Sequence, residues 1–331
     1  MMPKGKIRIL SQDDLTQALP MADAIAVIKE AFMVLSAGGV LMPERTHVDI
    51  PKHQGTALFM PSYADHFGKI GLKSVNIYPN NPQHGLPCIQ GMVCLLDGKT
   101  GTPLALLNGT YLTALRTGAA SGVATDLLAR PDAGRVALFG AGVQARTQLE
   151  AVCAVRSVQQ VRVFDLVTET ATTFAQEMGA RLDVEVIVAQ SPQDAVRSAD
   201  IICTVTVSAV PVFDHRDLAP GVHINAMGSY QPHVQEIPMD TVLQSRLLVD
   251  HRSSVLQETG DLIIPIQQGR MEPTHIQAEI GEILAGRALG RTSQSEITLF
   301  KSVGVAIQDL AAATRALDIA EGKELGTLVT L

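Results

Sequence analysis

The segment RVALFGAGVQAR, residues 135–146, combines residue types that can bind a nucleotide. Gly140 permits a tight turn after a strand-like run, and Gly142 lets a phosphate approach the backbone at the start of a helix. Ala145 takes the third small position of this G-x-G-x-x-A pattern. Asp165 ends the next strand-like run about 20 residues later, where a carboxylate can accept both ribose hydroxyls. The pattern predicts a site for NADH or NADPH. NADH is favoured because an acid there repels a 2′-phosphate.

Three cations stand in segments that are otherwise mostly apolar: Arg45 in PERTHVDIP, Lys73 in GLKSVN and Arg116 in LTALRTGAAS. A buried lone cation is costly, so each is expected to face an anion. Two arginines and a lysine suit a carboxylate, because a guanidinium can hold it in a bidentate fork. Ordinary surface salt bridges are the alternative for any one of them. The small apolar neighbours of Arg116 favour a functional role at that position.

The histidines and cysteines show no metal-binding pattern. The chain has nine histidines and four cysteines, but it has no C-x-x-C pair and no zinc-type spacing. It also lacks the G-x-S-x-G motif of serine hydrolases. We therefore predict no metal site, and we expect the cysteines to be reduced thiols.

The first third of the chain alternates strand-like segments with turn signals, after two segments with helical periodicity. This pattern predicts an α+β domain with a largely antiparallel sheet. The helical segments are 11–19 and 21–39, and the strand-like ones are 6–10, 44–51, 55–63, 69–79, 89–97 and 103–109.

From about residue 135, strands and helices alternate, as in a parallel, doubly wound Rossmann sheet. Residues 295–320 read as one long helix interrupted at Gly304. If that helix returns to the first domain, the nucleotide domain is an insertion. We therefore expect a Rossmann domain at 119–311 and a second domain made of 1–118 and 312–331.

Composition excludes several other classes of function. Hydrophobic residues make up 46% and charged residues 18%, which indicates a folded globular protein. A net charge of −7 and an aromatic content of 4% give no basic or stacking surface for nucleic acid. No apolar run approaches the roughly 18 residues of a membrane span, and the N-terminus lacks a signal-peptide core. We expect a cytoplasmic protein that binds neither nucleic acid nor membrane.

Several motifs together carry a family resemblance: PERTHVDIP, MPSY, GLKSVNIYPNNP, TYLTALRTGAASGVAT, LFGAGVQA, VHINAMGS and ITLFKSVGVAIQDL. With them the chain resembles the ornithine cyclodeaminase/mu-crystallin family over essentially its whole length. The resemblance implies a homodimer. It also implies that the N-terminal domain and the last helix form the substrate and dimerisation region, while the Rossmann domain holds a nicotinamide cofactor.

The resemblance assigns Arg45, Lys73 and Arg116 to the substrate carboxylate. It implies that Tyr230 lies in the substrate region, where it either donates a hydrogen bond or only shapes the pocket. The cofactor contacts that it implies are Cys88, Arg116, Gly140, Gly142, Val143, Gln144, Asp165, Thr206, Ala226, Met227, Gly228 and Val303.

Two departures from the family's cyclodeaminases bear on the reaction. Tyr230 stands where they carry an Asp, and Leu58 stands where they carry a Glu. Without these carboxylates the site lacks the general bases of amino-acid oxidation and ring closure. The resemblance therefore implies a reductase of cyclic 2-imino acids, converting Δ1-pyrroline-2-carboxylate to L-proline and Δ1-piperideine-2-carboxylate to L-pipecolate. The alternatives are ornithine cyclodeaminase, an alanine dehydrogenase-type activity, or a non-enzymatic binder of NAD(P)H and small ligands.

Overall fold

The computed structural model describes residues 5–330, and the chain divides into two compact units. Unit 1 comprises Met1–Arg116 and Val305–Leu331, and unit 2 comprises Thr117–Gly304. The sequence placed the second boundary later, inside the last helix. The two boundaries differ because this helix, α11 (Ala306–Gly322), packs along its length on the sheet of unit 1, so the chain leaves unit 2 before the helix begins.

Unit 1 is built on a seven-stranded sheet with the strand order β15-β1-β6-β5-β4-β3-β2. Every pair in it is antiparallel except β1 with β6, which confirms the largely antiparallel sheet expected from the turn signals. Its strands are β1 (Lys6–Leu10), β2 (Thr46–Ile50), β3 (Gly55–Ala64), β4 (Lys69–Ile77), β5 (Ile89–Asp97), β6 (Pro103–Asn108) and β15 (Thr327–Thr330).

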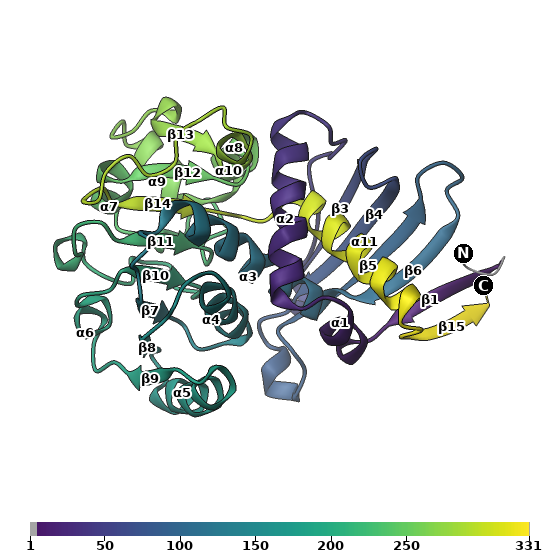
Figure 1. Cartoon of the computed structure of the whole chain (residues 1–331), viewed down its shortest axis with the longest axis horizontal. Coiled ribbons are helices and arrows are strands. Elements are labelled where there is room, and N and C mark those ends of the chain that lie inside the picture. The colour runs from purple at the N-terminus through teal and green to yellow at the C-terminus, as the bar shows by residue number, and fades with distance from the viewer. Residues whose placement is uncertain (1–4, 331) are drawn as a thin grey trace. The chain divides into compact units, whose positions relative to one another are not determined.

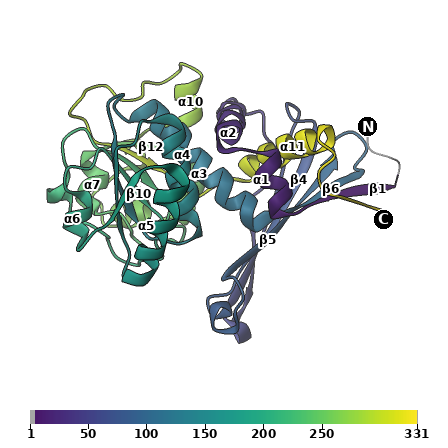
Figure 2. The ribbon, with the colours of Figure 1, turned by 60° about the horizontal axis from the view of Figure 1, so that its bottom comes forward.

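The helices of unit 1 lie on one face of this sheet (Figure 2). Helix α11 packs on β3, β4 and β5, and both α1 (Gln12–Ala18) and α2 (Met21–Ser36) pack against α11. A capping box between Ser11 and Asp14 starts α1, and the fully buried Ala24, Ile28 and Phe32 form part of the apolar stripe of α2. Short 3-10 helices follow β2 (Pro51–His53) and β4 (Asn81–His84).

Unit 2 is a doubly wound α/β sheet of eight parallel strands in the order β13-β12-β14-β11-β10-β7-β8-β9 (Figure 1). The strands are β7 (Arg135–Phe139), β8 (Gln160–Phe164), β9 (Glu185–Val188), β10 (Ile201–Thr204), β11 (His223–Ala226), β12 (Arg246–Val249), β13 (Ile276–Glu279) and β14 (Thr298–Lys301). The helices are α3 (Gly109–Leu128), which begins in unit 1, α4 (Val143–Val155), α5 (Thr168–Leu182), α6 (Pro192–Val196), α7 (Met239–Gln244), α8 (Arg252–Glu258), α9 (Gly260–Gln267) and α10 (Ile280–Leu284), with 3-10 turns at His215–Asp217 and Pro273–His275.

The order of strands in unit 2 reverses between β7 and β10. From β7 the chain adds β8 and β9 on one side, and it then crosses to β10 and β11 on the other. Ligands of open α/β sheets bind at such a switch point, outside the carboxyl ends of the strands. The fold therefore places the predicted cofactor residues of unit 2 at that edge, whereas Cys88 and Arg116 belong to unit 1.

The prediction of one long helix over residues 295–320 was wrong. Thr298–Lys301 is instead strand β14, which lies between β11 and β12, and α11 begins only at Ala306. All four strand residues are buried, as in an interior parallel strand. Gly304 has a φ of 76°, which ends any regular backbone there. Sequence analysis also assigned no structure to β12, β13, β15 or α7–α10.

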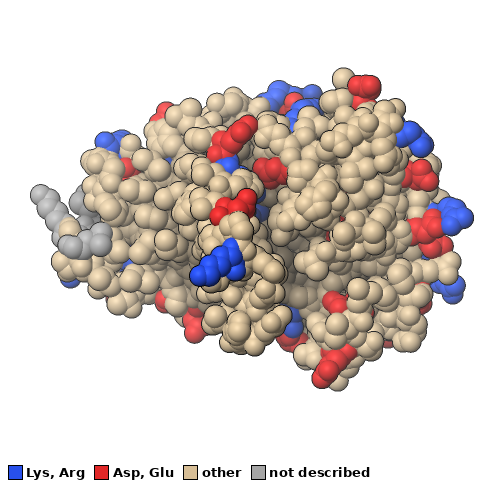
Figure 3. All heavy atoms as spheres, turned by 180° about the vertical axis from the view of Figure 1, so that it is seen from behind, with Lys and Arg blue, Asp and Glu red and all other residues tan. Residues whose placement is uncertain are grey.

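Acidic and basic side chains are interspersed on the face of the molecule in Figure 3, and neither sign forms a continuous patch there. Within residues 5–330, no helix is both long enough and apolar enough to span a bilayer.

Candidate active site

Lys73, Arg116 and Asp309 form a buried charge cluster within unit 1. Lys73 comes from β4, Arg116 from α3 and Asp309 from α11. The Lys73 Nζ lies 2.7 Å from Asp309 Oδ2, and the Arg116 Nε donates to Asp309 Oδ1 at 3.1 Å. The exposed fractions of these side chains are 1%, 7% and 3%. The structure thus joins two of the predicted cations through a carboxylate that sequence analysis missed.

Burial is the main influence on the Lys73 ammonium, and it lowers its pKa from 10.5 to about 7. The charge of Asp309 opposes this shift, whereas the charges of Arg116 and Arg45 add to it. For Asp309, burial alone would raise the pKa. The charges and hydrogen bonds of Lys73 and Arg116 outweigh that effect, so its pKa is lowered. Asp309 is therefore the ionised partner, and Lys73 can gain or lose a proton near neutral pH.

Arg45 adds a third positive charge to this cluster. It is half-buried, and it lies close enough to Lys73 for its charge to lower the lysine pKa. Without Arg45, two cations, Lys73 and Arg116, already share the single carboxylate of Asp309, so positive charge is in excess when Lys73 is protonated. Such an excess attracts an anionic ligand. The cluster can therefore hold a substrate carboxylate.

Gln308 fixes the orientation of Arg116. Its Oε1 accepts from Arg116 Nη1 at 2.9 Å and from the Val305 N–H at 3.1 Å. Both Gln308 and Asp309 were missed at the sequence level. The signal was present in GVAIQDLAAA, where two polar residues interrupt an apolar helical run. A buried acid in such a run requires a cationic partner.

The glycine loop of unit 2 has the geometry of an anion-binding turn. Gly140 has a φ of 90°, and Gly142 is the N-cap of α4 without a side-chain capping hydrogen bond. A Cβ added at Gly142 would meet no atom within 4 Å, so the backbone there is open to a ligand. Val143 is 65% exposed and Gln144 half-buried at the start of the helix. These residues fit the pyrophosphate of a dinucleotide.

Asp165 lies beside this loop, at the end of β8. Its Oδ2 accepts from the Ala141 N–H and its Oδ1 from the Val167 N–H, each at 2.9 Å. The carboxylate thus ties the glycine loop to the next strand. Its remaining lone pairs are available to ribose hydroxyls.

The residues predicted on the nicotinamide side lie at the same carboxyl edge of the sheet. Thr206 follows β10, Ala226, Met227 and Gly228 end and follow β11, and Val303 follows β14. The Val303 N–H donates to Asp250 at 3.1 Å. The hydroxyl and the N–H of Thr206 both donate to Glu236 at 2.7 Å. Thr206 can therefore contact a ligand through its surface but has no free hydrogen-bond donor for it.

The remaining predicted residues, Tyr230, Cys88 and Leu58, differ in how far they are exposed. Tyr230 is 38% exposed in unit 2, and Cys88 is half-buried in unit 1, with its carbonyl accepting from the Tyr78 N–H. Leu58 is buried against Met60, Val75 and Ala306. An apolar contact of that kind supplies no general base.

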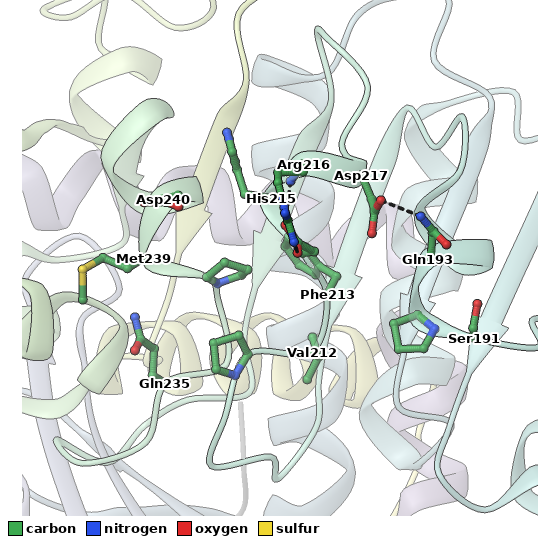
Figure 4. A pocket seen from close by; sticks show the side chains of 14 residues that line it. Ser191, Gln193, Val212, Phe213, His215, Arg216, Asp217, Gln235, Met239 and Asp240 are labelled. Atoms are coloured by element: carbon green, nitrogen blue, oxygen red, sulfur yellow. Dashed lines mark hydrogen bonds and ion pairs between the residues drawn. The ribbon is translucent and has the colours of Figure 1, made fainter.

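A surface pocket of about 940 Å³ opens elsewhere in unit 2 (Figure 4). It is lined by the loop after β10, the start of α6 and the segment before α7, and it includes His215, Asp217 and Gln193. None of the predicted cofactor or substrate residues lines it. In residues 5–330, no three His, Cys, Asp or Glu side chains group as a metal site, and the four cysteines are unbridged.

The fold and these clusters define a Rossmann-type α/β protein with an open glycine loop in one unit and a buried cluster of cations in the other. The sequence profile of the ornithine cyclodeaminase/mu-crystallin family matches residues 6–324, and the chain belongs to that family. It is 40% identical to a Δ1-pyrroline-2-carboxylate reductase of Bacillus cereus over 306 residues, which is 92% of this chain and 94% of the relative.

Two solved structures are also similar. One is the Δ1-pyrroline-2-carboxylate reductase of Thermococcus litoralis in complex with NADH and L-proline. It is 42% identical, with a TM-score of 0.94, and the match covers 97% of this chain and 99% of that one. The other is an archaeal alanine dehydrogenase dimer with bound NAD. It is 33% identical, with a TM-score of 0.92, and the match covers 98% and 99% of the two chains.

Proposed function

We propose that the protein is an NADH-dependent oxidoreductase that reduces Δ1-pyrroline-2-carboxylate to L-proline, and that it accepts Δ1-piperideine-2-carboxylate as a second substrate. The buried cluster of Lys73 and Arg116 around Asp309 is the observation that carries this proposal. The names of the similar proteins support the substrate class. The glycine loop and Asp165 fit the cofactor.

Each cation has a distinct part in this proposal. Arg45 and Arg116 hold the substrate carboxylate, and Arg116 is oriented for this by Asp309 and Gln308. Lys73 adds positive charge and donates a proton to the imine nitrogen, for which a lysine titrating near neutral pH is suited. Bound NADH supplies the hydride that the imine carbon receives. The product is the cyclic amino acid, and no ammonia is released.

The test is turnover with purified protein. NADH and NADPH absorbance is followed with fresh Δ1-pyrroline-2-carboxylate, while L-ornithine and NAD are incubated in parallel and assayed for ammonia. Oxidation of the reduced cofactor without ammonia from ornithine is expected. Ammonia with little imine reduction would instead establish a cyclodeaminase, and cofactor binding without turnover would establish a binder.

Activity is expected to decline as the pH rises through about 7. The sign follows from Lys73, which is protonated below its folded-state pKa of about 7 and loses its charge and its proton above it. Plots of kcat/KM for the imine against pH therefore show an alkaline limb near 7. A profile that stays flat up to pH 9 (about two units above the lysine pKa) would remove Lys73 from proton transfer and carboxylate binding.

Asp165 is proposed to select NADH. We expect D165S to raise the ratio of kcat/KM for NADPH over NADH about 10-fold or more, because it removes the charge that repels a 2′-phosphate. Steady-state kinetics with both cofactors measure this ratio. D183N, at the exposed C-cap of α5, is the control and keeps the wild-type ratio. An unchanged ratio in D165S would mean that Asp165 only holds the glycine loop.

A homodimer is proposed from the uncovered face of the unit 1 sheet. Phe59, Leu72 and Met92 are 38%, 39% and 55% exposed, and each alternates with buried residues that face α11. An apolar sheet face of this kind is typical of a protein–protein interface. The archaeal relative described as a dimer supports the same state.

The dimer is tested by placing a charge on that face. We expect M92E to convert the dimer to monomer, measured by light scattering after size exclusion, because a charge in the centre of an apolar interface is desolvated without a partner. L289E, at a 71% exposed position in unit 2, leaves the oligomeric state unchanged. A wild-type protein that is monomeric at micromolar concentration would contradict the proposal.

A further inference from the structure

A carboxylate outside the predicted site residues ties together the ends of two strands in unit 2. Glu236 is fully buried and accepts four hydrogen bonds. The donors are the Thr204 hydroxyl, the Thr206 N–H and the Thr206 hydroxyl, each at 2.7 Å, and the Gly228 N–H at 2.9 Å. Thr204 and Thr206 end and follow β10, and Gly228 follows β11. One side chain therefore fixes the spacing of two neighbouring loops at the carboxyl edge.

The backbone at Glu236 is fixed by a second buried carboxylate, Asp261. The N–H of Glu236 and that of Ile237 donate to Asp261 Oδ1 at 2.7 and 2.9 Å. The other oxygen of Asp261 lies 2.9 Å from the Nζ of Lys301, at the end of β14, and both of these side chains are at most 1% exposed. The neighbouring Gln235 lines the surface pocket in Figure 4, whereas Glu236 is fully buried. The carboxylate has little freedom to move.

The fit around Glu236 permits little substitution. A Cβ added at Gly228 would overlap both carboxylate oxygens, so only glycine fits there. Burial raises the pKa of Glu236, and the charge of Lys301 and the hydroxyls of Thr204 and Thr206 oppose that shift. Four donors, with an N–H on each oxygen, match the roughly four lone-pair sites of an ionised carboxylate. A glutamine would point an amide N–H at one of these donors. It would therefore break the arrangement while keeping its size and shape.

The geometry points to Glu236 as a positioning residue for the nicotinamide half of the cofactor. This inference rests on the proposed cofactor site, in which Thr206 and Gly228 line the nicotinamide side. Glu236 accepts hydrogen bonds from the N–H and the hydroxyl of Thr206 and from the N–H of Gly228. These donors are therefore not available to the nicotinamide ring, which must contact the other atoms of the two loops. Loss of Glu236 would leave the pyrophosphate and ribose contacts of Gly142 and Asp165 unchanged, because those residues belong to other strands.

The test compares two ligands that differ by the nicotinamide. Dissociation constants for NADH and for ADP-ribose are measured by calorimetry on E236Q and on the full-length wild type. We expect E236Q to weaken NADH roughly 10-fold or more and to leave ADP-ribose nearly unchanged. D200N is the matched control. Asp200 is also a buried, multiply bonded carboxylate, but it accepts from Gly134 and Arg135 at the opposite edge of the sheet. D200N should change neither the dissociation constant for NADH nor that for ADP-ribose.

Equal weakening of both ligands in E236Q, or weakening of neither, would overturn the inference. If E236Q does not fold, the variants T206V and T206S test the inference instead. Only T206S keeps the hydroxyl that donates to Glu236. NADH binding weakened in T206V and restored in T206S supports the inference, and wild-type binding in T206V overturns it. Failure of the proposed function is seen separately, as a wild type that binds NADH but does not reduce the imine.

Discussion

R116M is expected to raise the KM for Δ1-pyrroline-2-carboxylate roughly 100-fold, because charge-assisted hydrogen bonds of about 1.5–3 kcal/mol each are lost. Methionine keeps an unbranched side chain of similar length at this 6% exposed position but removes the charge. The Kd for NADH is expected to change little, since ten of the twelve predicted cofactor contacts lie in unit 2 and remain. Steady-state kinetics and a cofactor titration measure the two effects.

The same variant shifts the pH profile in a defined direction. The charge of Arg116 lowers the pKa of Lys73, so its removal raises that pKa and moves the alkaline limb of kcat/KM to higher pH. R156M serves as the control. Arg156 is largely buried in unit 2 and donates to the carbonyls of Thr125 and Ala129, so its loss affects stability and not the KM for the imine. An unaltered KM in R116M would show that the carboxylate site is misassigned.

D309N is expected to lower the free energy of unfolding by about 3–5 kcal/mol, because it leaves Lys73 and Arg116 buried without their counter-charge. The loss is larger when Lys73 is protonated. It is therefore greater at about pH 6 than at about pH 8, where the lysine is neutral. Urea unfolding at the two pH values measures this difference.

D309N and R116M have opposite effects on the pH profile. Asp309 raises the pKa of Lys73, so its neutralisation moves the alkaline limb of kcat/KM to lower pH. A limb that belonged to the substrate would move in neither variant. D318N is the matched control on the same helix, since Asp318 is 54% exposed and 3.3 Å from Lys69. Such a surface pair contributes about 0–1 kcal/mol. A D309N protein as stable as D318N would contradict the buried cluster.

The sequence alone determined the parts that depend on local pattern. Gly140, Gly142 and Asp165 were predicted as a nucleotide turn because such a turn needs particular residues at short, fixed spacing. Strands β1 to β6 of unit 1 and the alternating β/α order from β7 to β11 in unit 2 were recognisable from periodicity and turn residues. Strand β14 was not, because four buried residues next to a helical run have no period of their own. The positions of Lys73 and Arg116 in apolar segments indicated that they needed anions.

Only the tertiary structure decided which anions these are. Asp309 meets Arg116 from 193 residues away in the chain, and Glu236 meets Thr204 from 32. No local period records such pairs, because they arise when separate elements pack together. Because burying an unpaired charge is costly, each of these side chains must have a partner. Which partner it has is determined by packing: α11 packs on the unit 1 sheet, and the segment before α7 packs against the ends of β10 and β11.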